Sequence, residues 1–210
     1  NVDIAVTISD NAQDWIKQVE TRALETKTLY FNISTCSTKE DREGTITISG
    51  GNATQTITVK QSGVQEILEK EREVLIAFYE ATGGDNWTRN DNWCSDKPVG
   101  EWYGVTVDDT GFVVDLTLYR NNLVGEITDE IKNLQHLFFL GLSYNNLTKI
   151  PNALGGMPNM HFLYMDDCSL SAFPDNIEVL KHLKRLSLGG NHFNCEIPKN
   201  IGILTNLEEL

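Results

Sequence analysis

The feature that most constrains this chain is an apolar pattern that recurs every 23 or 24 residues. Each cycle reads Leu-x-Leu-x-x-Asn-x-Leu or a close variant, and its first position falls at residues 116, 140, 163, 186 and 210. Successive side chains of a strand point to opposite faces, so the paired leucines share one face of a short strand. A unit this short cannot bury its apolar face alone, and neighbouring units must stack into one continuous core.

One polar position of the cycle is expected to be structural. An Asn side chain both donates and accepts hydrogen bonds, so it can pair with backbone groups that stacking would otherwise bury without partners. In the third cycle a cysteine takes this place, and we expect it to be a buried thiol. The predicted ladder consists of Asn121, Asn145, Cys168 and Asn191.

The cycles, together with Gly125-Glu126-Ile127 and Glu196-Ile197-Pro198-Lys199-Asn200-Ile201-Gly202, resemble the plant-type and bacterial leucine-rich repeat class. The resemblance implies a right-handed α/β horseshoe, with four complete units over residues 113–210 and a fifth that is truncated. It also implies a surface that binds a peptide, a protein or a glycan. One apolar residue per unit is expected to close each coil on the convex side: Ile127, Ile150, Phe173 and Ile197.

Residues 64–112 are predicted to begin with a helix over about residues 64–81, whose apolar stripe is interrupted by Glu71 alone. Trp87, Trp93 and Trp102 follow, and then a hairpin turn over residues 108–111. This stretch resembles the helical N-terminal cap of plant-type leucine-rich repeat proteins. The resemblance implies that the tryptophans cover the open end of the repeat core. Gly100 and Val107 stand where the plant family has its cap cysteines.

Residues 1–63 alternate apolar and polar side chains in short runs, which predicts strands around residues 4–8, 29–33, 46–48 and 57–59. Trp15-Ile16, the run Arg42-Glu43-Gly44-Thr45-Ile46-Thr47-Ile48 and the run from Gln55 to Gly63 resemble the BACON domain. That family implies an immunoglobulin-like β-sandwich, here incomplete at its start. It is found in surface and secreted proteins of Bacteroidetes, and its members are proposed to bind carbohydrate or mucin or to act as spacers.

The strand register places outward-facing residues in columns on the concave face. Adjacent strands lie about 4.8 Å apart, so Phe139 and Phe162 are expected to touch. Exposed aromatic clusters usually mark a partner site, and we therefore predict a binding surface centred on Phe139, Phe162 and Tyr164. An alternative is that the rings only pack on each other. The predicted ligand-binding residues are Phe139, Phe162, Tyr164, Tyr119, Tyr144, Asp166, Asp167, Arg185 and Asp115.

Composition narrows the function classes. The net charge is −13 and no segment is basic, which argues against nucleic acid and anionic membrane surfaces. No run approaches the ~18 apolar residues of a membrane helix. No catalytic constellation, phosphate loop, metal site or cofactor motif is present, and His136 and His182 are expected to be exposed at the strand entry. Disulfide pairing is left open for Cys36, Cys94, Cys168 and Cys195.

These patterns favour a non-enzymatic binding protein, exposed on the cell surface or secreted, and the chain is interpreted as a piece of a longer protein. The family resemblance implies an extracellular or outer-membrane location, with a lipid anchor as one possibility, in a Bacteroides-like bacterium. The leading function is recognition of a protein partner, in adhesion or host interaction, on the concave face. The alternatives are glycan or mucin binding, through the aromatic patch or the BACON-like domain, and a structural spacer.

Overall fold

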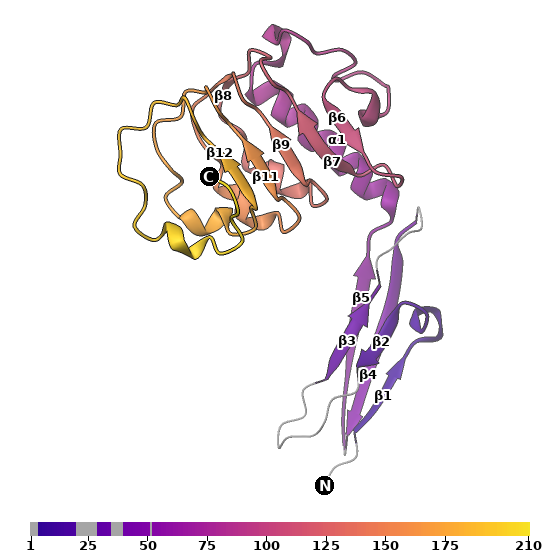
Figure 1. The fold of residues 1–210 in the computed structure, drawn as a ribbon. Coiled ribbons are helices and arrows are strands. Elements are labelled where there is room, and N and C mark those ends of the chain that lie inside the picture. The colour runs from indigo at the N-terminus through magenta and orange to yellow at the C-terminus, as the bar shows by residue number, and fades with distance from the viewer. Residues whose placement is uncertain (1–3, 20–28, 35–39, 51) are drawn as a thin grey trace. The chain divides into compact units, whose positions relative to one another are not determined.

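The computed structural model describes residues 4–19, 29–34, 40–50 and 52–210 (Figure 1). The chain divides into two compact units, Asn1–Ile67 and Leu68–Leu210. Cys36 and Gly51 lie outside the described residues.

The first unit consists of antiparallel strands. One sheet has the order β1-β4-β5 and a second pairs β2 with β3. The strand at β2 was not predicted from the sequence. The bounds are β1 Ile4–Ile8, β2 Ile16–Val19, β3 Tyr30–Ile33, β4 Arg42–Gly50 and β5 Ala53–Gln61, with a 3-10 turn at Asp10–Ala12.

A small core holds the first unit together. It is made by Ala12, Trp15, Ile16 and Ile46, all of which are buried. A Cβ atom at residue 44 would lie 2.4 Å from the Ala12 Cβ, so Gly44 allows β4 to approach the turn before β2. The Trp15 indole donates a hydrogen bond to the Asn11 carbonyl at 3.1 Å, which satisfies the polar edge of this ring.

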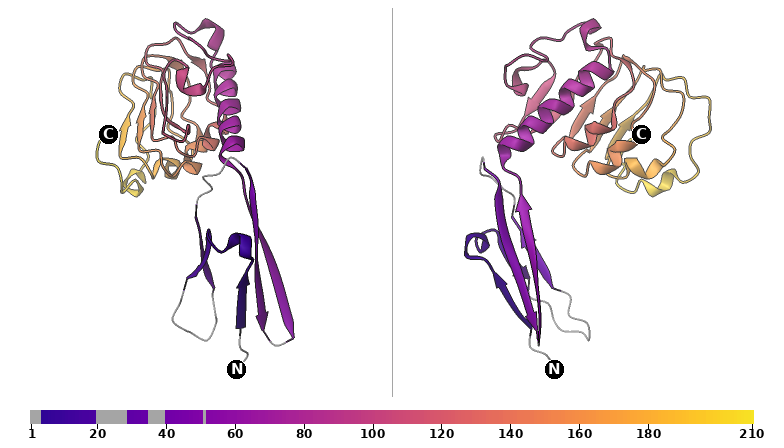
Figure 2. Two further views of the ribbon diagram at one scale, coloured as in Figure 1. Left: turned by 90° about the vertical axis from the view of Figure 1, so that its right-hand side faces the viewer. Right: turned by 180° about the vertical axis from the view of Figure 1, so that it is seen from behind.

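The helix α1 spans Val64–Ala81, the range that the sequence predicts. It buries Leu75 and Phe78, and Gly83 follows in a left-handed conformation (φ 71°) that ends it. The three tryptophan rings behind it pack in a chain, with centroids 4.9 Å (Trp87–Trp93) and 5.1 Å (Trp93–Trp102) apart. They share one core with Leu116 and Leu118, and Figure 2 shows α1 beside the first strands of the second unit.

The repeats form a sheet of the order β12-β11-β9-β7-β6, parallel except at the β6–β7 hairpin. The predicted register is confirmed, since Asp115, Phe139, Phe162 and Arg185 pair across it. Parallel strands β8 and β10 and a row of 3-10 helices complete the coils. The bounds are β6 Val105–Val107, β7 Val113–Thr117, β8 Val124–Gly125, β9 Phe139–Gly141, β10 Asn146–Leu147, β11 Phe162–Tyr164, β12 Arg185–Ser187, and 3-10 helices Gly84–Asn86, Val99–Glu101, Asp129–Asn133, Asn152–Gly156, Ile177–Leu180 and Ile201–Ile203.

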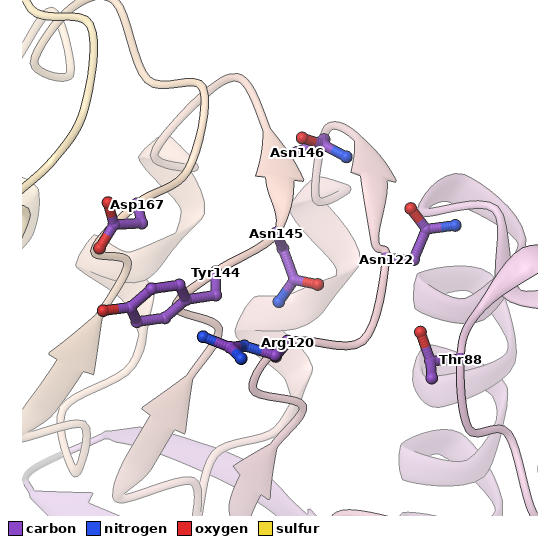
Figure 3. A pocket seen from close by; sticks show the side chains of 7 residues that line it. All are labelled: Thr88, Arg120, Asn122, Tyr144, Asn145, Asn146 and Asp167. Atoms are coloured by element: carbon purple, nitrogen blue, oxygen red, sulfur yellow. The ribbon is translucent and has the colours of Figure 1, made fainter.

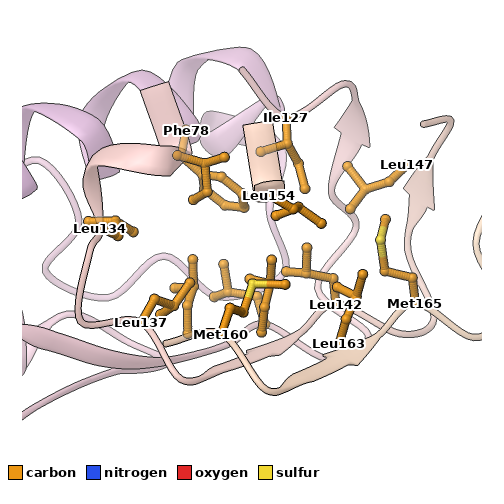
Figure 4. Close-up of a cluster of buried hydrophobic side chains, with 14 of the residues drawn as sticks. Phe78, Ile127, Leu134, Leu137, Leu142, Leu147, Leu154, Met160, Leu163 and Met165 are labelled. Atoms are coloured by element: carbon orange, nitrogen blue, oxygen red, sulfur yellow. The ribbon is translucent and has the colours of Figure 1, made fainter. Parts of the chain in front are cut away.

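The leucines of all coils meet in one continuous core (Figure 4). Ile127 and Ile150 are buried in it as expected, and Phe173 is partly buried with its ring stacked on Phe193 at 4.7 Å. The same prediction is wrong for Ile197, which is 58% exposed. Among the described residues no complete coil follows Ile197, and its side chain is therefore not covered by a neighbouring coil.

The ladder position makes a repeated set of hydrogen bonds. The Asn145 Oδ1 atom accepts from the backbone of Asn121 and Leu123 at 3.0 and 2.9 Å. Its Nδ2 donates to the carbonyls of Leu118 and Leu142, each at 2.8 Å. Asn191 repeats this arrangement two coils later. Cys168 donates only a long S–H bond of 3.4 Å to the Leu142 carbonyl, and burial raises the pKa of its thiol.

Candidate functional site

The face of the parallel sheet opposite the core carries four contiguous aromatic rings, Phe138, Phe139, Phe162 and Tyr164, here called the aromatic patch. Phe139 and Phe162 are register partners with ring centroids 6.2 Å apart. Phe139 also stacks on Tyr164 at 5.2 Å, and Phe138 meets the Phe162 ring edge-on at 4.9 Å. Phe138 is 45% exposed, whereas the other three are partly buried by one another.

Phe138 was not among the predicted site residues. When side chains alternate strictly between the two faces of the strand, Phe139 faces outward next to the inward Leu140. This pattern did not assign Phe138 to the outward face. The structure instead places Phe138 at the strand entry, where its ring reaches β11. Two adjacent phenylalanines before a buried leucine were the available sequence signal, because they cannot both point into the core.

The charged residues at the rim of the patch differ in how many intramolecular hydrogen bonds their side chains make. The Arg185 guanidinium pairs with Glu209 at 3.1 Å and lies 5.9 Å from the Phe162 ring centroid. The Asp166 carboxylate accepts from the hydroxyls of Ser143 and Ser187 at 3.0 and 2.5 Å, and from the Gly189 backbone at 2.9 Å. Asp166 therefore ties three repeats together, while Arg185 remains at the surface.

Asp115, another predicted rim residue, accepts a hydrogen bond of 2.7 Å from the Thr117 hydroxyl. Both residues belong to β7, so this contact orders the edge of the outward face next to the aromatic patch. The predicted site residues on this side are thus brought together around the patch.

The other predicted residues form a second cluster where the strands end. Tyr119 and Tyr144 are 48% and 41% exposed, with ring centroids 4.9 Å apart. The Arg120 guanidinium lies 5.1 Å from the Tyr144 centroid. The Asp167 carboxylate, which lies near the Tyr144 hydroxyl, raises the pKa of Tyr144. The structure thereby separates the predicted surface into the aromatic patch and this tyrosine cluster.

The tyrosine cluster sits on a backbone feature of the repeat. Equivalent positions in four coils all have positive φ: 49° at Arg120, 61° at Tyr144, 46° at Asp167 and 66° at Gly190. A left-handed backbone costs a residue with a Cβ about 1–2 kcal/mol relative to glycine. Three of the four positions nevertheless carry large or charged side chains, and Arg120 was not predicted as a site residue.

A buried polar contact lies away from both clusters. Glu71 on α1 is 1% exposed, and its Oε2 accepts a hydrogen bond of 2.8 Å from the Val113 backbone. Its Oε1 lies 3.7 Å from the Nδ1 atom of His136, and neither atom has a hydrogen-bond partner among the described residues. Burial raises the pKa of Glu71 to about 7. The His136 side chain is 40% exposed, in line with the prediction, and its ring stacks on Phe112 at 4.0 Å.

Metal and thiol chemistry have little support within the described ranges. No group of three or more His, Cys, Asp or Glu side chains there could hold a metal ion. Cys94, Cys168 and Cys195 are free thiols. No helix among the residues that the structure describes is both long enough and apolar enough to span a bilayer.

Comparison with sequence families identifies both parts of the chain. Residues 5–62 match the BACON model, described as Putative binding domain, N-terminal. Residues 136–157 and 182–204 match the Leucine Rich Repeat model. Among curated proteins, the chain is 37% identical over 110 residues to Receptor-like protein 50 of Arabidopsis thaliana, which covers 50% of this chain and 12% of that protein. It is 36% identical over 105 residues to Lumican of Coturnix japonica, with coverages of 47% and 30%.

Solved structures agree on the fold of the repeats. The BIR2 ectodomain from Arabidopsis thaliana superposes with a TM-score of 0.59 at 22% identity, over 66% of this chain and 77% of that one. The PEPR1-AtPEP1 structure gives a TM-score of 0.56 at 27% identity, over 67% of this chain and 20% of that one. The chain spans only 8% to 30% of the length of the first curated relatives it matches. The chain therefore carries a BACON domain over residues 5–62 and leucine-rich repeats over residues 136–157 and 182–204.

Proposed function

We propose that this protein is a non-catalytic binding protein that recognises a protein partner through the concave face of its repeats. The observation that carries the proposal is the aromatic patch, in which Phe138, Phe139, Phe162 and Tyr164 form one continuous apolar surface. Aromatic and arginine side chains dominate the energetics of protein interfaces, and Arg185 lies at the edge of this patch.

The comparisons support a recognition role. Matching relatives include Receptor-like protein 50 and Cuscuta receptor 1, whose names identify them as receptors. The PEPR1-AtPEP1 structure is 27% identical to this chain over the repeats. Ectodomains such as that of BIR2 share the fold. The likenesses to receptors favour an extracellular location. The BACON match is the reason that we also propose an outer-membrane location, adhesion or host interaction, and a gut-type bacterial source.

The architecture behind this surface is part of the proposal. We infer an immunoglobulin-like sandwich for the first unit, supported by two antiparallel sheets around the core of Trp15, Ile16 and Ile46. We infer a cap at the start of a right-handed horseshoe, supported by the burial of Phe78 and Trp102 in the repeat core. The domain bounds that we propose are residues 1–63, 64–112 and 113–210.

A pure spacer would be expected to cover its own aromatic side chains. The Phe138 ring is instead 45% exposed and continuous with Phe162. Single exposed apolar residues are common on protein surfaces, whereas a contiguous exposed apolar patch usually marks an interaction site. This favours binding over the spacer function.

The experiment is a surface plasmon resonance screen against purified extracellular and extracellular-matrix proteins, run with the wild type and the Phe139→Ser/Phe162→Ser double variant. Loss of two interface aromatics is expected to weaken binding at least about 100-fold. Val124→Ser is the matched control, because Val124 is 51% exposed on β8, outside the aromatic patch. Equal affinity of the double variant and the wild type for a partner would contradict the proposal.

A further inference from the structure

A separate pocket opens beside the tyrosine cluster, where the strands of the repeats end (Figure 3). It is a shallow, open depression with a volume of about 390 Å³. In Figure 3, Tyr144 lies between Asp167 and Arg120, while Thr88 and Asn122 line the other side. The lining side chains are Thr88, Arg120, Asn122, Tyr144, Asn145, Asn146 and Asp167.

The most informative group in this pocket is the Arg120 guanidinium. Among the described residues, no hydrogen-bond acceptor or carboxylate is paired with it. It contacts only the rings of Tyr119 and Tyr144, at 5.7 and 5.1 Å from their centroids. Every other arginine in the described ranges donates to an acceptor: Arg42 to Gln61, Arg72 to Lys97, Arg89 to Asp91 and Arg185 to Glu209. Arg120 therefore presents a fork of free donors held in place by two rings.

An acceptor stands on the opposite side of the Tyr144 ring. In Figure 3 the Asp167 carboxylate lies beside the hydroxyl end of the Tyr144 ring. Gly190 leaves room for it, since a Cβ atom there would lie 2.3 Å from the Asp167 Oδ1 atom. A carboxylate has about four lone-pair positions, and Asp167 is exposed, so its side chain is able to accept hydrogen bonds from a ligand.

The other lining residues are polar, and they differ in how many of their hydrogen-bonding groups are free to contact a ligand. The amide of Asn145 is fully used by the ladder, so this residue serves only as a wall. Asn122 donates to the Asn86 carbonyl at 2.8 Å, which fixes its side chain with the amide oxygen still able to accept. Thr88 and Asn146 are exposed. The exposed Tyr144 ring adds an apolar surface between these groups.

This combination selects a ligand class. One cation and one carboxylate line the pocket, so its formal charge is zero and it does not call for a charged ligand. Donors and acceptors that alternate around a ring match hydroxyl groups, each of which both donates and accepts. The negative face of an aromatic ring attracts the C–H groups on the apolar side of a sugar ring. An apolar peptide side chain would instead need an apolar lining, which the pocket lacks outside Tyr144.

We propose that this pocket is a saccharide site that binds an uncharged sugar ring, with Arg120 donating to its oxygens and Asp167 accepting from its hydroxyls. Tyr144 supports the C–H face of the sugar, and Asn122 and Thr88 contact its rim. The site is distinct from the aromatic patch and does not rest on the proposed protein partner.

The test is saturation-transfer NMR and calorimetry on the full chain, with methyl glycosides of glucose, galactose, mannose and N-acetylglucosamine and short oligosaccharides of them. We expect at least one to bind with a Kd of about 10 mM or tighter. Arg120→Gln and Asp167→Asn are each expected to weaken that binding about tenfold or more, because each removes a charged hydrogen-bond partner. Tyr144→Phe keeps the aromatic ring, so it is expected to lose less saccharide affinity than Tyr144→Ser.

Two controls separate this site from the rest of the sheet. Arg185→Gln removes an exposed arginine outside the pocket, and Phe139→Ser/Phe162→Ser disables the aromatic patch; both are expected to bind sugar like the wild type. Thermal melting confirms that each variant is folded. The proposal is overturned if no neutral saccharide binds saturably, or if the folded Arg120 and Asp167 variants bind as the wild type does.

Discussion

At the scale of single residues, Glu71 is where the chain departs most from its own pattern. A carboxylate in the apolar stripe of a helix is costly to bury unless it is paired. Its Oε2 has the Val113 N–H, but its Oε1 is 3.7 Å from His136 Nδ1, too long for a hydrogen bond. The pattern of the sequence identified Glu71 as an interruption of the stripe. Its contact with His136 depends on how α1 packs against the first repeat. The local sequence pattern does not predict that packing.

The raised pKa of Glu71 makes stability depend on pH. The folded-state value of about 7 lies above the ordinary value of 4.5, so the folded chain binds this proton more tightly. That contribution is fully present below about pH 4.5 and is lost as the pH rises through about 7. Glu71→Gln removes the buried charge and keeps an acceptor for Val113. We expect it to stabilise the protein by about 2 kcal/mol more at about pH 8 than at about pH 4.

Chemical denaturation of the repeat unit at the two pH values measures this difference. Glu73→Gln is the matched control, because Glu73 is exposed on the same helix. Equal pH dependence in Glu71→Gln and Glu73→Gln would show that the Glu71 carboxyl does not titrate as its burial requires.

Asn145 supports a second prediction at this scale. It is 4% exposed and satisfies two backbone N–H groups and two carbonyls of neighbouring coils. Asn145→Ala leaves these groups buried and unpaired, so we expect a loss of about 3 kcal/mol in the free energy of unfolding. Asn146→Ala, which changes the exposed neighbour, is expected to stay within about 0.5 kcal/mol of the wild type. Urea denaturation of both variants checks this, and similar losses in the two would contradict the structural role of the ladder.

At the scale of elements, the periodic patterns of the sequence predicted the features that depend only on how the repeats stack, namely the strand register and the range of the helix. The register of β7, β9, β11 and β12 follows from equal spacing of leucines, and the range of α1 follows from its apolar stripe and the glycines behind it. The short strand β2 was missed because it carries no alternating run. Phe138 and Arg120 were missed because their contacts are made by side chains that reach neighbouring strands.

The strand β9 also explains how the aromatic patch is shaped. Gly141 lies beside Phe139, and a Cβ atom there would approach the Phe139 ring at 2.7 Å. Gly141→Ala is therefore expected to push this ring off its stack on Tyr164 and to weaken partner binding about tenfold, with a stability loss of about 1 kcal/mol. Gly202→Ala is the control, since a Cβ there meets nothing within 4 Å. Affinity and melting temperature are measured together. Undiminished binding by folded Gly141→Ala would mean that the position of Phe139 does not matter.

At the scale of the whole molecule, the chain has two cores that share no buried side chain among the described residues. The first is small, whereas the second runs through every repeat. Stability in stacked repeats is set by contacts between neighbours, so a defect in one coil is expected to spread to those beside it. A defect in the core around Trp15 is expected to affect the strands of the first unit.

Native-state hydrogen exchange of two core variants tests this division. Ile46→Val is expected to lower the opening free energy of β4 amides by about 1 kcal/mol and to leave β9 and β11 unchanged. Leu140→Ala is expected to lower the opening free energies of the amides in β7, β9 and β11 together by about 3 kcal/mol and to leave those of β4 unchanged. The reason is that Leu140 lies between Leu116 and Leu163 in register, so its cavity loosens both neighbours. Protection that falls in β4 when Leu140 is truncated would mean that the two cores unfold as one cooperative unit.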